Sequence, residues 1–268
     1  GSNDACGIAS LTLDNSNFAC ADVGANTVTL TATDVNGNST TCTAQVTVED
    51  NVAPVAICQD VTVQLDAQGN GSTSATAVDN GSNDACGIAS LTLNNTGFTC
   101  ANVGSNNTVT LTATDVNGNS STCTAQVTVE DNVAPVALCQ NVTVQLDAQG
   151  NGSTSATAVD NGSNDACGIA TLTLDNTSFA CANVGSNNTV VLTATDVNGN
   201  STTCSAQVTV EDNVAPVALC QDVTVQLDAQ GNGSTTATAV DAGSNDACGI
   251  SSLTLDNSNI GCSNVGNN

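Results

Sequence analysis

Short runs of Val, Leu and Ile alternate with Thr and Ser along the chain, and polar turns rich in Asp, Asn and Gly separate these runs. Alternation of apolar and polar residues places the apolar side chains on one face of a β-strand. Asn-Gly and Gly-Asn steps favour tight turns, and no segment keeps a helical period. In the stretch that begins at Asn51, we expect strands at 55–58, 61–65, 72–78, 88–93, 109–113 and 123–129.

This strand-and-turn pattern is copied several times along the chain. The string GSNDACGI begins at Gly1, Gly81, Gly162 and Gly243, which lie 80, 81 and 81 residues apart. Such a period indicates tandem domains, because it is too long for one coil of a solenoid and suits a small β-sandwich. The predicted fold is all-β, with tandem immunoglobulin-like Greek-key β-sandwiches of about seven strands arranged end to end.

One proline stands in each copy, after a Glu-Asp-Asn step, at Pro54, Pro135 and Pro216. Proline lacks a backbone donor and stiffens an extended chain, so these positions suit linkers between domains. Because the chain starts and stops within a repeat, we expect it to be part of a longer protein. The predicted organisation is 1–50 as the C-terminal part of a repeat, 51–131 and 132–212 as complete immunoglobulin-like repeats, and 213–268 as the N-terminal part of a repeat.

The charge balance excludes several classes of function. The chain has 268 residues with 25 acidic side chains and no Lys, Arg or His. Nucleic acids and anionic membranes are bound through Lys and Arg, so neither is an expected partner. Most acid–base and nucleophilic catalysis needs His or Lys, so we do not expect an enzyme. No apolar run is long enough to cross a bilayer, so no membrane insertion is expected in this segment.

The 14 cysteines recur at fixed places in each repeat. Without histidine or a CxxC pair they do not fit zinc sites, and no base is present to activate a thiol, so we interpret them as disulfides of an extracellular protein. Three pairings are possible for four cysteines in a repeat. First and last strands of an immunoglobulin-like sandwich lie side by side, which favours Cys58–Cys123 and Cys139–Cys204. The remaining pairs would be local, at Cys6–Cys20, Cys86–Cys100, Cys167–Cys181 and Cys248–Cys262, with Cys42 and Cys220 bonded outside the sequence.

Acidic and amide side chains gather in three segments that a sandwich brings to one pole, namely the linker and the loops at 79–85 and 115–119. Calcium prefers six to eight oxygen ligands of this kind. An alternative is that Asp and Asn serve only as turn formers. The absence of cations in the chain favours calcium. The candidate ligands are Glu49, Asp50, Asn51, Asp79, Asp84, Asp115, Asn117 and Asn119 at the first junction, Glu130, Asp131, Asn132, Asp160, Asp165, Asp196, Asn198 and Asn200 at the second, and Glu211, Asp212, Asp241 and Asp246 at the third.

Four motifs keep their order within each repeat. They are Pro-Val-Ala-Ile-Cys at 54–58, DNGSNDACGI at 79–88, TATDVNGNSSTC at 112–123 and VTVED at 127–131. Together they resemble the hyalin repeat, which has an immunoglobulin-like fold, and the resemblance covers the whole chain. The linker VEDNVAP is loosely similar to the calcium linker of cadherins. The near-identity of the copies resembles the giant cell-surface adhesins of Bacteroidota, which implies an adhesive extracellular filament on a bacterial cell surface.

Two functions are compatible with these observations. The first is a structural stalk, filament or adhesin that is stiffened by disulfides and by calcium at the junctions. Its partners would be neighbouring repeats of the same chain, with possible self-assembly into fibres. The alternative is a carbohydrate- or surface-binding module that uses the loops between strands. Glycan sites usually offer an aromatic platform, and the absence of Trp and Tyr counts against this alternative.

Overall fold

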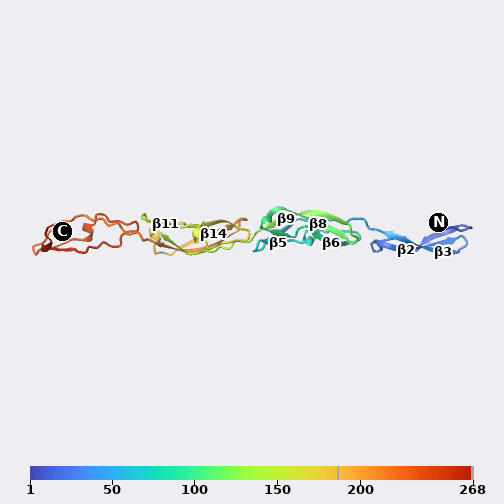
Figure 1. The fold of residues 1–268 in the computed structure, drawn as a ribbon, viewed down its shortest axis with the longest axis horizontal. Coiled ribbons are helices and arrows are strands. Elements are labelled where there is room, and N and C mark those ends of the chain that lie inside the picture. Colours follow the sequence, from blue (N-terminus) through green and yellow to red (C-terminus); the bar gives the residue numbers. More distant parts are fainter. Residues whose placement is uncertain (186, 267–268) are drawn as a thin grey trace. The chain divides into compact units, whose positions relative to one another are not determined.

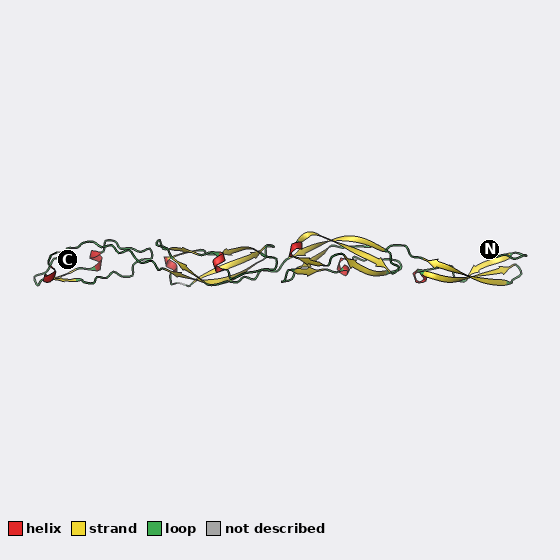
Figure 2. Ribbon diagram, viewed as in Figure 1, coloured by secondary structure: helices red, strands yellow, loops and turns green. Residues whose placement is uncertain are grey.

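The computed structural model describes residues 1–185 and 187–266 and divides into two compact units, Gly1–Asn132 and Val133–Asn268. Strands are the main regular elements of both units, and each helix is a single short turn (Figures 1 and 2). The chain therefore has the predicted all-β class, with tandem immunoglobulin-like repeats. The finer division into four segments stays a prediction. None of the described helices has the length and hydrophobicity to span a bilayer.

The first unit contains one complete set of repeat strands, preceded by a shorter sheet. Its short helices are α1 (Ala75–Val78) and two 3₁₀ turns, η1 (Cys20–Asp22) and η2 (Cys100–Asn102). Its strands are β1 (Ile8–Leu13), β2 (Gly24–Asp34), β3 (Ser39–Val48), β4 (Val61–Gln64), β5 (Asn70–Ser72), β6 (Ile88–Leu93), β7 (Gly97–Thr99), β8 (Gly104–Asp115) and β9 (Ser120–Glu130).

Three sheets form in the first unit. The first is an antiparallel sheet in the order β1-β2-β3, and the second has the order β4-β9-β8-β6. Within the second sheet, β4 runs parallel to β9, with Val61 opposite Val127, whereas β8 is antiparallel to both β6 and β9. The third sheet pairs β5 with β7. The parallel pairing of an early strand with the last strand closes the sandwich-like repeat.

The second unit repeats the four-stranded sheet and the β5–β7 pair of the first unit, as expected from its near-identical sequence. Its sheets have the orders β10-β15-β14-β12, β11-β13 and β16-β17. Its helices are α2 (Ala156–Val159) and α3 (Ala237–Val240), with 3₁₀ turns η3 (Cys181–Asn183) and η4 (Cys262–Asn264). Its strands are β10 (Val142–Gln145), β11 (Asn151–Ser153), β12 (Ile169–Leu174), β13 (Ser178–Ala180), β14 (Asn188–Asp196), β15 (Ser201–Glu211), β16 (Asn232–Ser234) and β17 (Asn259–Gly261).

The core of each complete repeat is formed by the apolar positions that alternate along the strands. Buried and partly buried residues alternate along β8 and β14, as a half-buried strand requires. One aromatic ring lies in each core, because Phe98 and Phe179 are buried, whereas Phe18 and Ile260 are only half-buried. The core cluster of the second unit consists of Val144, Leu146, Val159, Phe179, Val190, Leu192, Ala206, Val208 and Val210.

Two of the expected strands are replaced by other structure. The strand prediction for 72–78 is wrong, because β5 ends at Ser72 and α1 begins at Ala75. The backbone N–H of Ala77 donates to the hydroxyl of Ser74, so an N-cap starts the helix in a segment too short for periodicity to identify. Residues 55–58 form only isolated bridges, Val55 to Asn83 and Cys58 to Asp79.

The structure contains the two disulfides within repeats that the strand arrangement predicts. Cys58 is bonded to Cys123, and Cys139 is bonded to Cys204, with a Cα–Cα distance of 5.8 Å in each case. Each bond ties the segment after the linker proline to the last strand of the same repeat.

The predicted local disulfides are wrong. Cys20 is bonded to Cys86, and Cys181 is bonded to Cys248, so these bonds join neighbouring repeats across a proline linker. The prediction fails because Cys86 and Cys100 lie at opposite poles of one repeat: the extended strands β6 and β7 separate them. A disulfide requires Cα atoms within about 7 Å. The replaced pairs are Cys6–Cys20, Cys86–Cys100, Cys167–Cys181 and Cys248–Cys262.

Six further cysteines complete the set. Cys100 and Cys167 are both disulfide-bonded. Among the described residues, the free cysteines are exposed, and they are Cys6, Cys42, Cys220 and Cys262.

Candidate cation site at the proline linker

The first linker is fixed to the repeat that follows it. The side-chain amide of Asn119 donates to the backbone carbonyl of Asp50 at 2.9 Å, and the hydroxyl of Ser121 donates to the carbonyl of Pro54 at 2.5 Å. The backbone N–H of Val52 donates to Oδ1 of Asp50 at 3.1 Å. These bonds hold the backbone of the linker against the turn that precedes β9 and thereby orient the Asp50 side chain.

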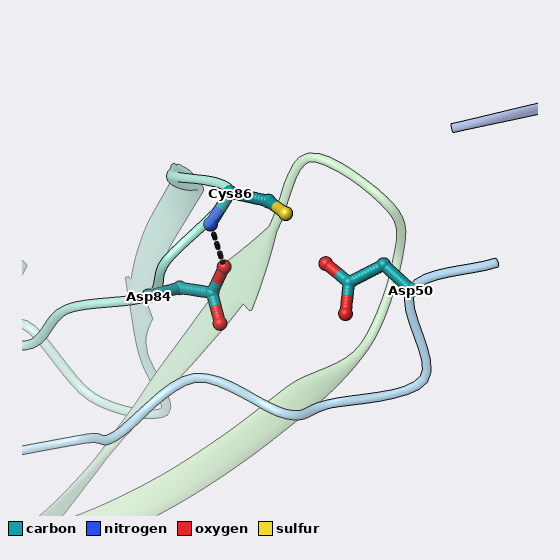
Figure 3. Close-up of side chains that lie close together, drawn as sticks. All are labelled: Asp50, Asp84 and Cys86. Atoms are coloured by element: carbon teal, nitrogen blue, oxygen red, sulfur yellow. Dashed lines mark hydrogen bonds between the residues drawn. The ribbon is translucent and has the colours of Figure 1, made fainter. Parts of the chain in front are cut away.

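The carboxylate of Asp50 faces the carboxylate of Asp84 and the sulfur of Cys86 (Figure 3). One ligand-type atom from each of the three residues lies within 4.8 Å of the other two. Oδ2 of Asp50 is buried and accepts no hydrogen bond. An anionic oxygen is therefore withdrawn from solvent next to a second carboxylate.

A tight turn orients Asp84. The backbone N–H groups of Cys86 and Gly87 donate to Oδ1 of Asp84 at 2.7 and 3.2 Å. Gly87 has a φ of 105°, which an L side chain rarely adopts. The Cys86 sulfur is already bonded to Cys20, so it is not available as a thiolate ligand. Carboxylate oxygens are thus the ligands that the site can offer.

Two carboxylates at this distance repel each other on the order of 3 kcal/mol at an effective dielectric constant of about 20. The chain has no Lys, Arg or His with which to neutralise them. A divalent cation would remove the repulsion, and hard cations prefer carboxylate oxygens.

The second unit contains the same arrangement. Asp212, Asp246 and Cys248 lie within 4.8 Å of one another by the same criterion, and all three are partly buried. The backbone N–H of Val214 donates to Oδ1 of Asp212 at 3.0 Å, and that of Cys248 donates to Oδ1 of Asp246 at 2.8 Å. The geometry around Asp50 is therefore a property of the repeat. The remaining linker lies at the boundary between the two units.

At each linker, the Glu and Asn residues on either side of the aspartate bond to other side chains and do not join the carboxylate cluster. At the end of β9, the side-chain amide of Gln64 donates to Glu130 Oε2 at 2.7 Å, and the Asn132 amide donates to Gln64 Oε1 at 2.7 Å. Glu211 and Asn213 bond to Gln145 in the same way. Glu49 and Asn51 are exposed and bond to each other. Sequence reasoning did not identify Gln64 and Gln145, although their recurrence in the VTVQ strand could have drawn attention to them.

Asp79 caps its own loop and does not join the Asp50–Asp84 cluster. The backbone N–H groups of Ser82 and Gly81 donate to its carboxylate at 2.9 and 3.2 Å. Hydrogen bonding from Ser82 holds the pKa of Asp79 below its ordinary value. Asp160 and Asp241 occupy the same position in their loops, and the same cause lowers the pKa of each.

Asp115 is 2% exposed, yet it is fully engaged in the DVNGN turn. Burial raises the pKa of Asp115, but the hydrogen bonds from the Asn119 side chain and the backbone N–H groups of Asn119 and Asn117 outweigh it, so the pKa is lowered. Asp196 is held in the same way by Asn198 and Asn200. Asp115 and Asn119 thus brace the linker, while Asn117 is exposed.

Comparisons with known proteins give similarity at the level of solved structures. No family model matches the chain, and no curated protein matches it. The extracellular cadherin domains 1–4 of protocadherin gamma B7 share 13% identity over 81% of this chain and 66% of that one, with a TM-score of 0.32. Immunoglobulin domains 1–4 of Sidekick-1 share 10% identity over 72% and 60%, with a TM-score of 0.33.

Human CDH23 EC21-23 shares 15% identity over 68% of this chain and 73% of that one, with a TM-score of 0.34. The chain spans less than two thirds of the length of the protocadherin and Sidekick-1 structures. The assignment of the fold rests on the strand pairings described above.

Proposed function

We propose that this chain is the repeat region of an extracellular stalk, filament or adhesin on a bacterial cell surface, of the hyalin-repeat type that its motifs resemble. The observation that carries the proposal is the disulfide between successive repeats. Cys20 precedes the Pro54 linker and Cys86 follows it, with their Cα atoms 5.1 Å apart. A covalent bond across a linker suits a part whose task is to hold its neighbours in a fixed relation.

The location follows from the redox chemistry of these bonds. Disulfides persist in oxidising environments and are rare where cytosolic thiols keep cysteines reduced. Disulfides at positions that repeat along the chain therefore support an extracellular location. The excess of 25 acidic residues keeps such an array soluble and repels other anionic surfaces.

Calcium at the linkers is the second part of the proposal. Asp50 and Asp84 supply two carboxylates, and Oδ2 of Asp50 is buried without a hydrogen bond. The remaining ligands would be backbone carbonyls and water, so we expect the weak affinity of extracellular calcium modules, about 10⁻⁴–10⁻³ M. Binding would neutralise the carboxylates and stop movement of the linker against the loop that contains Asp84.

Calorimetric titration of the chain with calcium tests this site. Asp50→Asn and Asp84→Asn remove charge but keep an oxygen that accepts the bonds from Val52 and Cys86. We expect each variant to bind one calcium fewer than the unaltered chain and to gain less thermal stability from 5 mM calcium.

Asp60→Asn is the matched control. Asp60 accepts a hydrogen bond from the backbone N–H of Gln126, and the natural Asn141 does the same for Gln207 in the next repeat. This control should keep the full stoichiometry. Equal stabilisation by calcium and by sodium chloride of the same ionic strength, in all variants, would show screening alone and would refute the cation site.

Small-angle scattering tests the stalk itself. A rigid array keeps one maximum dimension in oxidising buffer, and reduction should broaden its distribution of distances. A chain that is equally flexible in both buffers would contradict the stalk, whatever its calcium stoichiometry.

A further inference from the structure

The disulfides create a covalent route that is far shorter than the backbone. The Cys20–Cys86 bond joins residues 66 positions apart, and the Cys181–Cys248 bond joins residues 67 positions apart. Both bonds pass over a proline linker. Between Cys86 and Cys100, both of which are disulfide-bonded, the backbone runs for only 14 residues.

These 14 residues run from one pole of the repeat to the other. Cys86 lies near Asp50, where the linker enters. At the other pole, the sulfur of Cys100 lies 3.9 Å from the carbonyl oxygen of Gly69, in the turn that follows β4. The end of β4 pairs with Glu130, where the chain leaves the repeat. The segment between the two cysteines contains β6 and β7, which are already extended.

We propose that the chain has a further function as a tension-bearing cable, in which axial force passes through the inter-repeat disulfides and the β6–β7 segment instead of through the folded repeats. This inference rests on the proposed stalk function. Force that arrives at Cys20 crosses to Cys86 and leaves the residues between them without load. The shielded residues include β2, β3, the linker and β4.

The bypassed residues would add much more length on unfolding than the load-bearing segment can. A 14-residue segment spans at most about 50 Å when fully extended, whereas the 66 residues bypassed by Cys20–Cys86 would extend to about 220 Å. Unfolding of the bypassed residues under force therefore adds no length to the array. The weak contacts of the linker, including the candidate cation site, are then not required to resist the pull.

The sulfurs of the Cys181–Cys248 bond pack against Gly150 in the turn after β10. Gly150 has a φ of 75°, and a side chain there would place its Cβ 2.6 Å from the sulfur of Cys181 and 3.6 Å from that of Cys248. The next repeat reaches the same turn, because Ala247 would lie 3.2 Å from that Cβ. The turn after β10 is thus a socket for the disulfide between two repeats.

The free thiols provide the handles for a test. Cys262 is equivalent to the bonded Cys181, because each lies against a glycine carbonyl, of Gly231 and Gly150 respectively. Cys6 is equivalent to the bonded Cys86, because the backbone N–H of each donates to an aspartate two residues earlier. Both thiols are exposed. In a chain with Cys42→Ser and Cys220→Ser, maleimide-linked DNA handles on Cys6 and Cys262 would allow optical-tweezers pulling along the array.

We expect the oxidised chain to show no extension step as long as about 150 Å, the gain that loading through Cys58–Cys123 would give. Adding a thiol reductant under constant force should then produce discrete steps, up to about 220 Å for each bond broken. Reduction under force does not depend on the folding of any variant. Long steps before reduction, or no gain in length after it, would overturn the cable.

Two double variants separate the inter-repeat bond from disulfides in general. Cys20→Ser with Cys86→Ser forces the covalent route through Cys58–Cys123, which adds about 150 Å to the oxidised extension. Cys58→Ser with Cys123→Ser removes a bond that the proposed route does not use, so its oxidised extension should equal that of the parent chain. Loss of calcium binding with unchanged short extension would refute the cation site and leave the cable intact.

Discussion

Gly71 lies directly opposite Phe98 in the two-stranded sheet of β5 and β7. Because glycine has no side chain, core residues pack directly against its backbone. A Cβ at Gly71 would lie 2.5 Å from Cγ1 of Val63 and 3.1 Å from Cδ2 of Leu65. Both neighbours are buried, so neither has free room to move.

Gly71→Ala should therefore destabilise its repeat by about 1–3 kcal/mol, the usual cost of overpacking a core. Denaturant unfolding followed by circular dichroism measures this difference. Gly97→Ala in β7 is the control, because a Cβ there meets nothing within 4 Å. Equal effects of the two substitutions would show that strand propensity, and not packing, explains the glycine.

Loss of the disulfide within a repeat should be more costly. On the chain-entropy model, removing Cys58–Cys123, which joins residues 65 positions apart, costs about 4 kcal/mol. Cys58→Ala with Cys123→Ala should lower the thermal midpoint of that repeat in calorimetry and leave the Cys139–Cys204 repeat unchanged. A simultaneous loss in both repeats would indicate that the two unfold as one cooperative unit.

The socket under Cys181–Cys248 gives a test of connectivity. Gly150→Ala should reduce the fraction of this bond formed in oxidative refolding, because the new Cβ meets both sulfurs. Gly162→Ala carries similar backbone strain, with a φ of 85°, but its Cβ has nothing within 4 Å. Non-reducing peptide mapping with an Asp-specific protease should find the bond intact in the control. Recovery of Cys167–Cys181 peptides from the unaltered chain would refute the connectivity.

Acid should weaken the fold through its hydrogen-bonded aspartates. The backbone N–H of Thr29 donates to Asp14 at 2.9 Å and lowers the pKa of Asp14 in the folded chain. A lowered folded pKa stabilises the fold above the unfolded pKa, and this stabilisation disappears as pH falls below about 4. Asn94 accepts the same bond from Thr110 at 2.8 Å without titrating.

Asp14→Asn should consequently flatten the loss of stability between pH 5 and about pH 2 and have little effect at pH 7. Asn94→Asp should steepen that loss in its own repeat. Acid unfolding followed by circular dichroism gives both slopes. Slopes that both match the parent chain would mean that Asp14 contributes nothing to acid sensitivity.

The sequence predicted the disulfides within repeats because strand order determines them. Cys58 follows the linker and Cys123 lies near the start of the last strand, and these two segments are neighbours in an immunoglobulin-like sandwich. Cys86 was different, because identical repeats offer it two partners with the same surroundings, Cys100 in its own repeat and Cys20 in the previous one. Only the direction of β6 and β7 decides between them, and composition does not encode that direction.

The location of the candidate cation site was predicted from the sequence, but the orientation of its individual side chains was not. Asp50 and Asp84 were expected at one pole, and their carboxylates lie within 4.8 Å of each other, whereas calcium binding there stays a prediction. Side chains alternate along an extended chain, so residues next to Asp50 project to the opposite side. Glu49 and Asn51 bond to each other for this reason, and Glu130 and Asn132 both bond to Gln64. The pole was therefore predictable from strand order, whereas the facing of individual side chains was not.

The bond between Cys20 and Cys86 also has a genetic consequence. A cysteine that precedes a linker is bonded to one that follows it at Cys20–Cys86, and again at the equivalent positions Cys181–Cys248. Recombination that removes or duplicates a whole period leaves such cysteines with equivalent partners in register. A deletion of part of a period leaves two thiols unmatched. The array can therefore change its length in whole copies, and near-identical copies make such exchange easy.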